Sequence, residues 1–227
     1  MYYNVKKEFT KQTCGRKCEK KGKKMNEVNK ENMPTKFNRV ILASSSEIRI
    51  KILNKYFSKV EKVSHKIDEK KFKTPGKKPE EIVLTIARKK ALSVIEDYSD
   101  DIVIASDQIL VCENKILSKP KTLEAAKKKL LFLRNKTHQL YSSIYVMKKR
   151  RFYFQQVKKA SIFVKNLSQR DIESYVRTNH KTVINTVGSY KIEENPRYKF
   201  IRVINGDLET ILGFPIKDLI EKIKHEK

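Results

Sequence analysis

Hydrophobic residues of this chain gather in short, dense blocks that are separated by polar, lysine-rich stretches. The segments RVILAS (39–44) and DIVIAS (101–106) each hold an uninterrupted apolar run, which predicts two buried strands. A third strand is expected within KVEKVSHKI (59–67). QILVCENKIL (108–117) follows the second block and predicts a short hairpin that turns at residues 113–114.

Apolar residues at helical spacing predict helices between and after these strands. The segment PEEIVLTIARKKALSVIED (79–97) is a strong candidate, because a proline opens it and acidic residues follow in its first turn. TLEAAKKKLLFL (122–133) begins with a threonine that can cap a helix. Further helices are expected over 46–57, 168–179 and 213–225.

Two long β-rich runs follow the middle helices. THQLYSSIYVMKK (137–149) and RFYFQQVKKASIFV (151–164) are joined by a basic turn, which predicts one long antiparallel hairpin. Strands therefore alternate with helices early in the chain and pair as a hairpin later. This order predicts an α/β fold with a mixed sheet.

The first part of the chain differs from the rest in composition. Residues 1–37 are polar, rich in lysine and without a sustained period, so we expect a disordered basic extension before a single folded domain over 38–227. Translation from Met25 or Met33 would shorten this extension. A basic arm that contacts nucleic acid and an organellar targeting segment are the alternatives.

The net charge of +26 favours polyanionic partners such as nucleic acid, an acidic membrane or a phosphorylated small molecule. A coding bias that spreads lysine over a solvated surface is the alternative, and it is favoured because no single stripe holds the excess. Three cysteines, an odd number, argue against a disulfide scaffold. No apolar run approaches the roughly 18 residues of a membrane helix. We therefore expect a cytoplasmic protein without a membrane partner.

Three consecutive serines follow the first buried block. A strand that ends at Ser44, Ser45 and Ser46 and turns into a helix presents free backbone N–H groups at the helix start, where a phosphate is favoured. Arg49 lies about one turn further and can add charge-assisted donors. Simple capping is the alternative, but it explains one serine rather than three and an arginine.

Asp107 places a carboxylate between the apolar runs IVIA and QILV. A buried charge needs a partner, a metal or a proton. By strand alternation Ser106 and Asp107 face opposite sides of the sheet, and both sides of this strand are expected to be covered. An acid at such a strand end faces a ligand crevice in many α/β folds; an ordinary turn aspartate is the alternative.

Lysines and a second acidic element complete the candidate chemistry. Lys90 lies at the margin of an apolar helix face, where it either snorkels to solvent or holds an anion in a cleft. Lys119, before a proline, either presents its ammonium to a phosphate or is one more solvated lysine. Asp68 and Glu69 would form a divalent-cation and polyphosphate site if they converged with these lysines. The histidines share no ligand spacing and are expected to be structural or surface residues: His65, His138, His180 and His225.

Eight segments in order resemble the motifs of the Maf family of nucleotide pyrophosphatases: LASSSEIR, IDE, ARKKA, ASDQIL, SKP, LRNKTH, VGSYKIE and GFP. The resemblance covers about residues 39–222. It implies an inosine-triphosphatase-like α/β fold, an elongated mixed sheet flanked by helices with a deep central cleft. It also implies an enzyme that hydrolyses a nucleoside triphosphate to the monophosphate and pyrophosphate with Mg²⁺ or Mn²⁺.

The resemblance further implies roles for the residues at the motif positions. Asp107 would be the catalytic acid and, with Glu69, a metal ligand. The substrate-binding residues would be Ser44, Ser46, Arg49, Lys90, Lys119, Gln108 and Glu193. A homodimer is a further expectation from the family, and some members have been linked to restraint of septum formation.

Departures from the family pattern lie near the base-recognising region. Glu47 replaces the usual proline, Ile48 stands where arginine is frequent, and ENPRYK (194–199) replaces a glycine-rich end. Gln108 resembles the branch that prefers 7-methyl-GTP, whereas the dTTP/UTP branch carries threonine there. A 7-methyl-GTP-type substrate is therefore expected, and dTTP or UTP is the alternative. A nucleic-acid-binding regulator on the same scaffold is a second alternative, disfavoured because no basic face carries interleaved aromatic residues.

Overall fold

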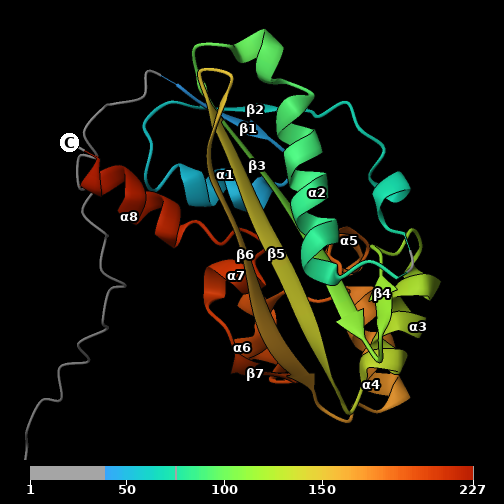
Figure 1. Cartoon of the computed structure of the whole chain (residues 1–227). Helices are drawn as coiled ribbons and strands as arrows, with labels where there is room; N and C mark the ends of the chain where they lie inside the picture. The colour runs from blue at the N-terminus through green and yellow to red at the C-terminus, as the bar shows by residue number, and fades with distance from the viewer. Residues whose placement is uncertain (1–38, 75, 227) are drawn as a thin grey trace, which may run out of the picture. The chain divides into compact units, whose positions relative to one another are not determined.

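The computed structural model describes residues 39–74 and 76–226, so the expected basic extension over 1–37 lies outside the described residues. Seven strands form one sheet in the order β2-β1-β3-β5-β6-β7, with β4 beside β3 (Figure 1). The strands are β1 Val40–Ala43, β2 Val60–Val63, β3 Ile102–Cys112, β4 Lys115–Leu117, β5 Lys136–Lys148, β6 Arg151–Val164 and β7 Ile201–Asn205. β1 is parallel to β2 and β3, and the other pairs are antiparallel. The predicted α/β fold with a mixed sheet is confirmed.

Helices follow the strands on both faces of the sheet. The α-helices are α1 Glu47–Leu53, α2 Pro79–Leu92, α3 Leu123–Leu133, α4 Gln169–Thr178, α5 His180–Asn185, α6 Asn195–Tyr198, α7 Leu208–Ile211 and α8 Lys217–His225. The 3-10 helices are η1 Glu69–Phe72, η2 Ile95–Tyr98 and η3 Ile192–Glu194. Within the described ranges, none of these helices has the length and apolar character that a membrane crossing requires.

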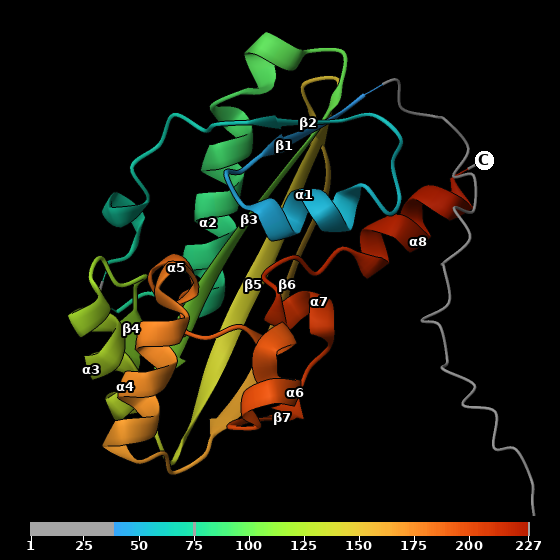
Figure 2. The same ribbon diagram turned by 180° about the vertical axis from the view of Figure 1, so that it is seen from behind.

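Strand alternation assigns the two faces of the sheet. Val40 and Leu42 of β1 pack with α1 and α8, whereas Ile41 and Ala43 pack with α2. Figures 1 and 2 show α2 on one face and α1 and α8 on the opposite one. Both faces of β1 and β3 are therefore buried, which explains the uninterrupted apolar blocks of the sequence.

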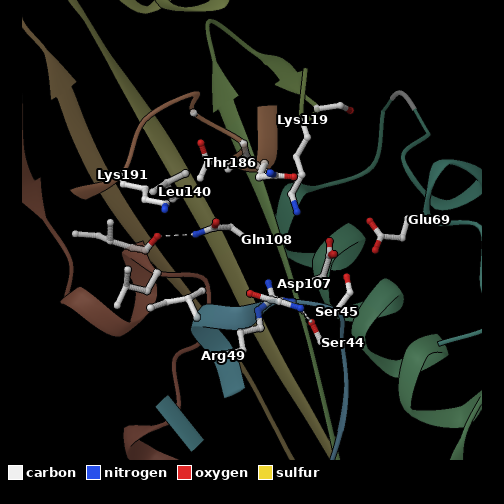
Figure 3. Close-up of a pocket in the computed structure, with 18 of the residues that line it drawn as sticks. Ser44, Ser45, Arg49, Glu69, Asp107, Gln108, Lys119, Leu140, Thr186 and Lys191 are labelled. Carbon is white, nitrogen blue, oxygen red and sulfur yellow. Dashed lines mark hydrogen bonds between the residues drawn. The ribbon is translucent and has the colours of Figure 1, made fainter. Parts of the chain in front are cut away.

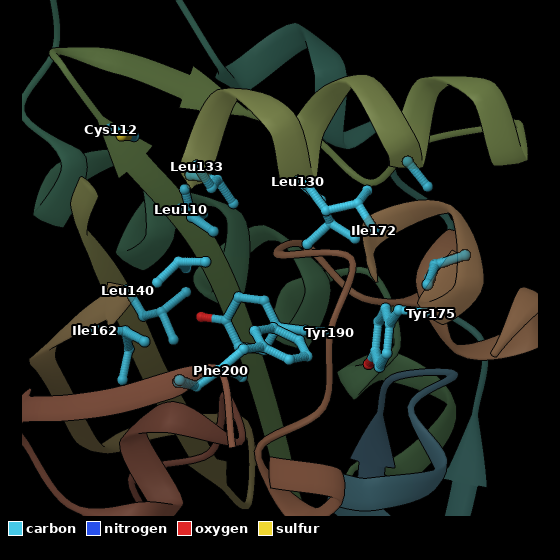
Figure 4. Close-up of a cluster of buried hydrophobic side chains, with 14 of the residues drawn as sticks. Leu110, Cys112, Leu130, Leu133, Leu140, Ile162, Ile172, Tyr175, Tyr190 and Phe200 are labelled. Atoms are coloured by element: carbon cyan, nitrogen blue, oxygen red, sulfur yellow. The ribbon is translucent and has the colours of Figure 1, made fainter. Parts of the chain in front are cut away.

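A second apolar cluster joins the helices α3 and α4 to the sheet. Leu130 of α3 and Ile172 of α4 pack over β3, β5 and β6 together with aromatic residues of the segment that follows (Figure 4). The ring of Phe200 lies edge-on to Tyr175 at 5.0 Å and to Tyr190 at 6.4 Å. These contacts position the segment around residue 190 beside the sheet.

Several predicted boundaries changed for local reasons. The helix expected over 79–97 ends at Leu92, where the Ser93 hydroxyl donates to the Lys90 carbonyl at 2.8 Å, and η2 follows. The helix expected over 213–225 begins only at Lys217. The strand expected over 101–106 instead runs without a break from Ile102 to Cys112.

The predicted turns are present. Glu113 and Asn114 have φ of 49° and 60° and join β3 to β4. Lys149 and Arg150, with φ of 50° and 61°, join β5 to β6. Positive φ at both central residues is typical of tight hairpins, because it matches the twist of the flanking strands.

Candidate active site

An unpaired stretch of β3 creates the space for the site. β5 pairs with one edge of β3 from Ile102 to Val111. The opposite edge pairs with β1 only as far as Ile104 and with β4 only from Leu110 onward. The intervening residues have no strand partner on that edge within 39–74 and 76–226, and Asp107 lies in the middle of them. A cleft between β1 and β4 follows from this topology.

A cavity of about 440 Å³ occupies this region (Figure 3). The loop after β1, η1, α2, β3, the loop after β4 and the segment around residues 185–193 supply its lining. All nine site residues expected from the sequence line it: Ser44, Ser46, Arg49, Glu69, Lys90, Asp107, Gln108, Lys119 and Glu193. Residues far apart in the sequence are thus brought to one cavity.

Lys90 joins the two carboxylates of the site. It lies on the buried face of α2 and is 3% exposed. Its Nζ is 2.7 Å from Oε1 of Glu69 and 2.9 Å from Oδ1 of Asp107. A buried ammonium is tolerated only with such partners, since desolvation of an unpaired charge is costly. Lys90 therefore does not snorkel to solvent but faces the cavity.

One of the two carboxylate oxygens of Asp107 has a hydrogen-bond partner among the described residues and the other has none. Strand alternation turns its side chain toward α2, while Ser106 turns to the other face and donates from Oγ to the Gly213 carbonyl at 2.8 Å. Oδ1 of Asp107 binds Lys90, whereas Oδ2 is buried and has no hydrogen-bond partner among the described residues. A buried acceptor without a partner is unfavourable, so this oxygen is suited to accept a proton or bind a cation.

The carboxyl group of Glu69 stays ionised. A hydrogen bond from His65, and then Lys90, keep the pKa of the Glu69 carboxyl well below its usual range. His65 Nε2 lies 3.3 Å from Oε1 of Glu69, and Lys73 Nζ lies 3.8 Å from Oε2. His65 lines the cavity, although the sequence indicated only a structural or surface histidine. Its position four residues before Glu69 was the one available signal.

The serine loop differs from a simple helix cap. Ser46 precedes α1 without forming a side-chain cap hydrogen bond. Ser44 Oγ instead accepts from the Ser46 N–H and from Nη1 of Arg49, each at 3.2 Å. The capping alternative is therefore not realised, and the three serine residues line the cavity.

The guanidinium of Arg49 bonds to three segments: the serine loop, β3 and the turn at Gly213. Nη1 donates to the Ser106 carbonyl at 2.9 Å, on the unpaired edge of β3, and Nε donates to the Gly213 carbonyl at 3.0 Å. Burial lowers the pKa of Arg49, and the charges of Asp107 and Glu69 oppose that shift. Arg49 thus supplies positive charge and holds the floor of the cavity in place.

Lys119 and Gln108 also line the cavity. Burial, and then the charge of Arg49, lower the pKa of Lys119. Gln108 Nε2 donates to the carbonyls of Thr210 at 3.1 Å and Ile211 at 3.0 Å. Gln108 therefore anchors α7 to the sheet.

The cavity has two chemically different ends. Figure 3 shows Glu69, Asp107 and Ser44 toward one end and Leu140 and Lys191 toward the other. Thr186, Tyr190, Ile211 and Leu212 also line the cavity. The motif VGSYKIE includes Tyr190 and Lys191, but the sequence singled out none of these residues individually, because none of them has an unusual pattern. An elongated ligand with an anionic end and a flat apolar end fits this arrangement.

Residues 39–226 match the family model described as Maf-like protein. A dTTP/UTP pyrophosphatase of Acholeplasma laidlawii is 36% identical over 63% of this chain and 73% of its own length. A 7-methyl-GTP pyrophosphatase of Bartonella henselae is 33% identical over 82% of this chain and 94% of its own length. The solved structure of the Staphylococcus aureus Ham1 protein aligns with a TM-score of 0.47 at 19% identity, over 83% of this chain and 100% of that one.

Proposed function

Because this chain belongs to the family of Maf-like proteins, we propose that it is a nucleoside triphosphate pyrophosphatase. It would hydrolyse its substrate to a nucleoside monophosphate and pyrophosphate. The names of the relatives support this class of reaction. The observation that carries the proposal is the buried Oδ2 of Asp107, which lies beside the ammonium of Lys90 and has no hydrogen-bond partner in the described part of the chain.

The charges of the cavity suit a triphosphate. Lys90, Lys119 and Arg49 converge at one end, and their positive charge offsets the charge of a polyphosphate in a partly desolvated site. The apolar end beyond Gln108 would receive the nucleoside, with Leu140 against the flat base.

The reaction follows from the free oxygen of Asp107. A water oxygen would bond to the α-phosphorus as the bond to the bridging oxygen of the pyrophosphate breaks. Asp107 Oδ2 would take the proton of that water as general base. Lys90 would hold the carboxylate in this orientation through Oδ1, and the nearby cations would stabilise charge that develops on the phosphoryl oxygens.

The residues also fit a divalent cation. No group of three or more acidic, histidine or cysteine side chains among residues 39–74 and 76–226 is arranged to hold an ion alone. Mg²⁺, however, is commonly held by one or two carboxylates together with substrate phosphates. Glu69 would supply one of those carboxylates, and Asp107 would supply the other through the lone pair of Oδ2 that the attacking water does not use. The ion, when bound, would contribute charge stabilisation at the phosphates.

Pyrophosphate release in the presence of Mg²⁺ tests the proposal directly. Asp107→Asn should keep the fold, because Lys90 retains Glu69 as a partner. It should lower kcat by at least about 100-fold, since the general base is lost. Asp97→Asn is the matched control, because Asp97 forms only an exposed pair with Lys66. Full activity of the folded Asp107→Asn protein would refute the assigned role of Asp107.

The same assay addresses the base. We propose a 7-methyl-GTP-type substrate on the basis of Gln108, with dTTP or UTP as the alternative. Relatives of both names resemble the chain, so a panel with 7-methyl-GTP, dTTP, UTP and GTP is required. Release confined to dTTP and UTP would contradict the first preference while supporting the reaction.

A further inference from the structure

Lys129 connects two walls of the cavity from outside. It lies on α3, and its Nζ donates to the carbonyl of Ser118 and, at 3.0 Å, to that of Val187. Ser118 belongs to the loop after β4, and Val187 follows α5. Both residues line the proposed active site, whereas Lys129 does not. One ammonium thus contacts two cavity segments that are distant in sequence.

Packing alone does not explain a lysine at this position. Burial lowers the pKa of Lys129 to about 8. Within the described part of the chain its ammonium contacts carbonyls, without a carboxylate to offset its charge. The adjacent Leu130 belongs to the apolar cluster of Figure 4, and Leu117 and Val187 pack against the same cluster. A methionine would fill such surroundings without the desolvation of an ammonium.

The two carbonyls stand next to residues that the proposed function requires. Ser118 directly precedes Lys119, so fixing its carbonyl restricts the backbone that carries the Lys119 ammonium. Val187 lies three residues before Tyr190, which also lines the cavity. Small displacements of binding groups weaken substrate binding strongly, because each contact depends on distance and direction.

We propose that Lys129 is a positioning residue of the active site, which clamps the loop after β4 to the segment after α5. The inference rests on the proposed function, because it assigns the clamped residues to substrate binding. Lys129 itself does not touch the substrate. Its loss should therefore affect substrate binding more than the chemical step.

Steady-state kinetics of the full chain test this division. Lys129→Met should raise KM by about tenfold and change kcat by less than about threefold, since hydrogen bonds to a charged group are lost without removing a reacting group. Lys129→Arg can still donate to both carbonyls and should restore most of the affinity. Lys128→Met removes the same charge from the exposed side of α3 and should leave both constants unchanged.

Amide hydrogen exchange gives a readout that does not need activity. Residues 117–121 and 186–191 should exchange faster in Lys129→Met than in the wild type and in Lys128→Met. If Lys129→Met does not fold, Lys129→Gln provides a second neutral variant for both measurements. An unchanged KM, unchanged exchange in these segments, or an equal effect of Lys128→Met would each overturn the clamp. Absence of pyrophosphate release by the wild type would refute the proposed function instead, and the exchange experiment would still decide the clamp.

Discussion

The two carboxylates of the cavity have different surroundings although they share one lysine. The Asp107 side chain is 5% exposed, whereas that of Glu69 is 34% exposed and also faces His65. The free oxygen of Asp107 is buried without a hydrogen-bond partner among the described residues, so it can accept a hydrogen bond from a water molecule. The hydrogen bond from His65, and then Lys90, keep the pKa of Glu69 low, so Glu69 stays ionised. We therefore expect different roles for two acids of the same chemical type.

His138 makes folding stability sensitive to mild acid. It is fully buried, shares a hydrogen bond of 2.6 Å with the Tyr190 hydroxyl, and burial lowers its pKa from 6.5 to about 4. The unfolded chain therefore binds a proton at higher pH than the folded protein does. The contribution of His138 to stability is present above pH 6.5 and is lost as the pH falls toward 4.

We predict that the free energy of unfolding of the wild type falls by about 3 kcal/mol more than that of His138→Gln across this range. Glutamine keeps a hydrogen-bonding group for Tyr190 but does not titrate. Urea titrations at several pH values measure the difference. His225→Gln is the control, because that side chain is 84% exposed. Parallel pH dependence of wild type and His138→Gln would contradict the prediction.

At the level of elements, the turn between α7 and α8 closes the floor of the cavity. Gly213 has φ of +82°, and its carbonyl accepts from Arg49 and from the Ser106 hydroxyl. A β-carbon at Gly213 would lie 3.1 Å from Oε1 of Gln108 and 3.3 Å from Nη2 of Arg49. The turn therefore requires glycine for its conformation and for the space beside two cavity residues.

Gly213→Ala should destabilise the protein by more than the roughly 1 kcal/mol expected for positive φ alone, and it should also reduce kcat/KM. Gly76→Ala is the matched control, because Gly76 has φ of +83° and nothing within 4 Å of the added carbon. Thermal unfolding and pyrophosphate release of both variants give the comparison. Equal effects of the two substitutions would show that the contacts with Gln108 and Arg49 are unimportant.

For the whole molecule, the net charge of +26 raises the alternative of a nucleic-acid-binding regulator. Non-specific binding to a polyanion releases counterions and falls steeply with salt. A small substrate in a cavity is less affected, because partly buried charges are screened less than exposed ones.

We predict that binding of the full chain to single-stranded DNA weakens by more than about 100-fold between 50 and 200 mM salt, whereas kcat/KM for the preferred nucleotide falls by less than about tenfold. Fluorescence anisotropy and pyrophosphate release measure the two quantities in the same buffers. Tight DNA binding at the higher salt without any pyrophosphate release would favour the regulator.

Long elements with a clear local pattern were predictable. The apolar blocks of β1 and β3 and the hairpin of β5 and β6 were all expected from the sequence. The segment 180–212 was not, because α5, α6, α7 and β7 are four to six residues long and too short to show a period. The early end expected for β3 was wrong, since Asp107 interrupts the apolar run without ending the strand.

Residue order and local pattern were enough for the fold class, the family and the identity of the candidate cavity residues, because these depend on near neighbours and on the succession of motifs. The unpaired edge of β3 around Asp107 was decided only in three dimensions, as were the carbonyl partners of Arg49 and the place of His65. The contacts of Lys129 belong to the same group. Except for the contact of His65 with Glu69, each of these features joins segments that are distant along the chain. Only tertiary packing brings such segments together.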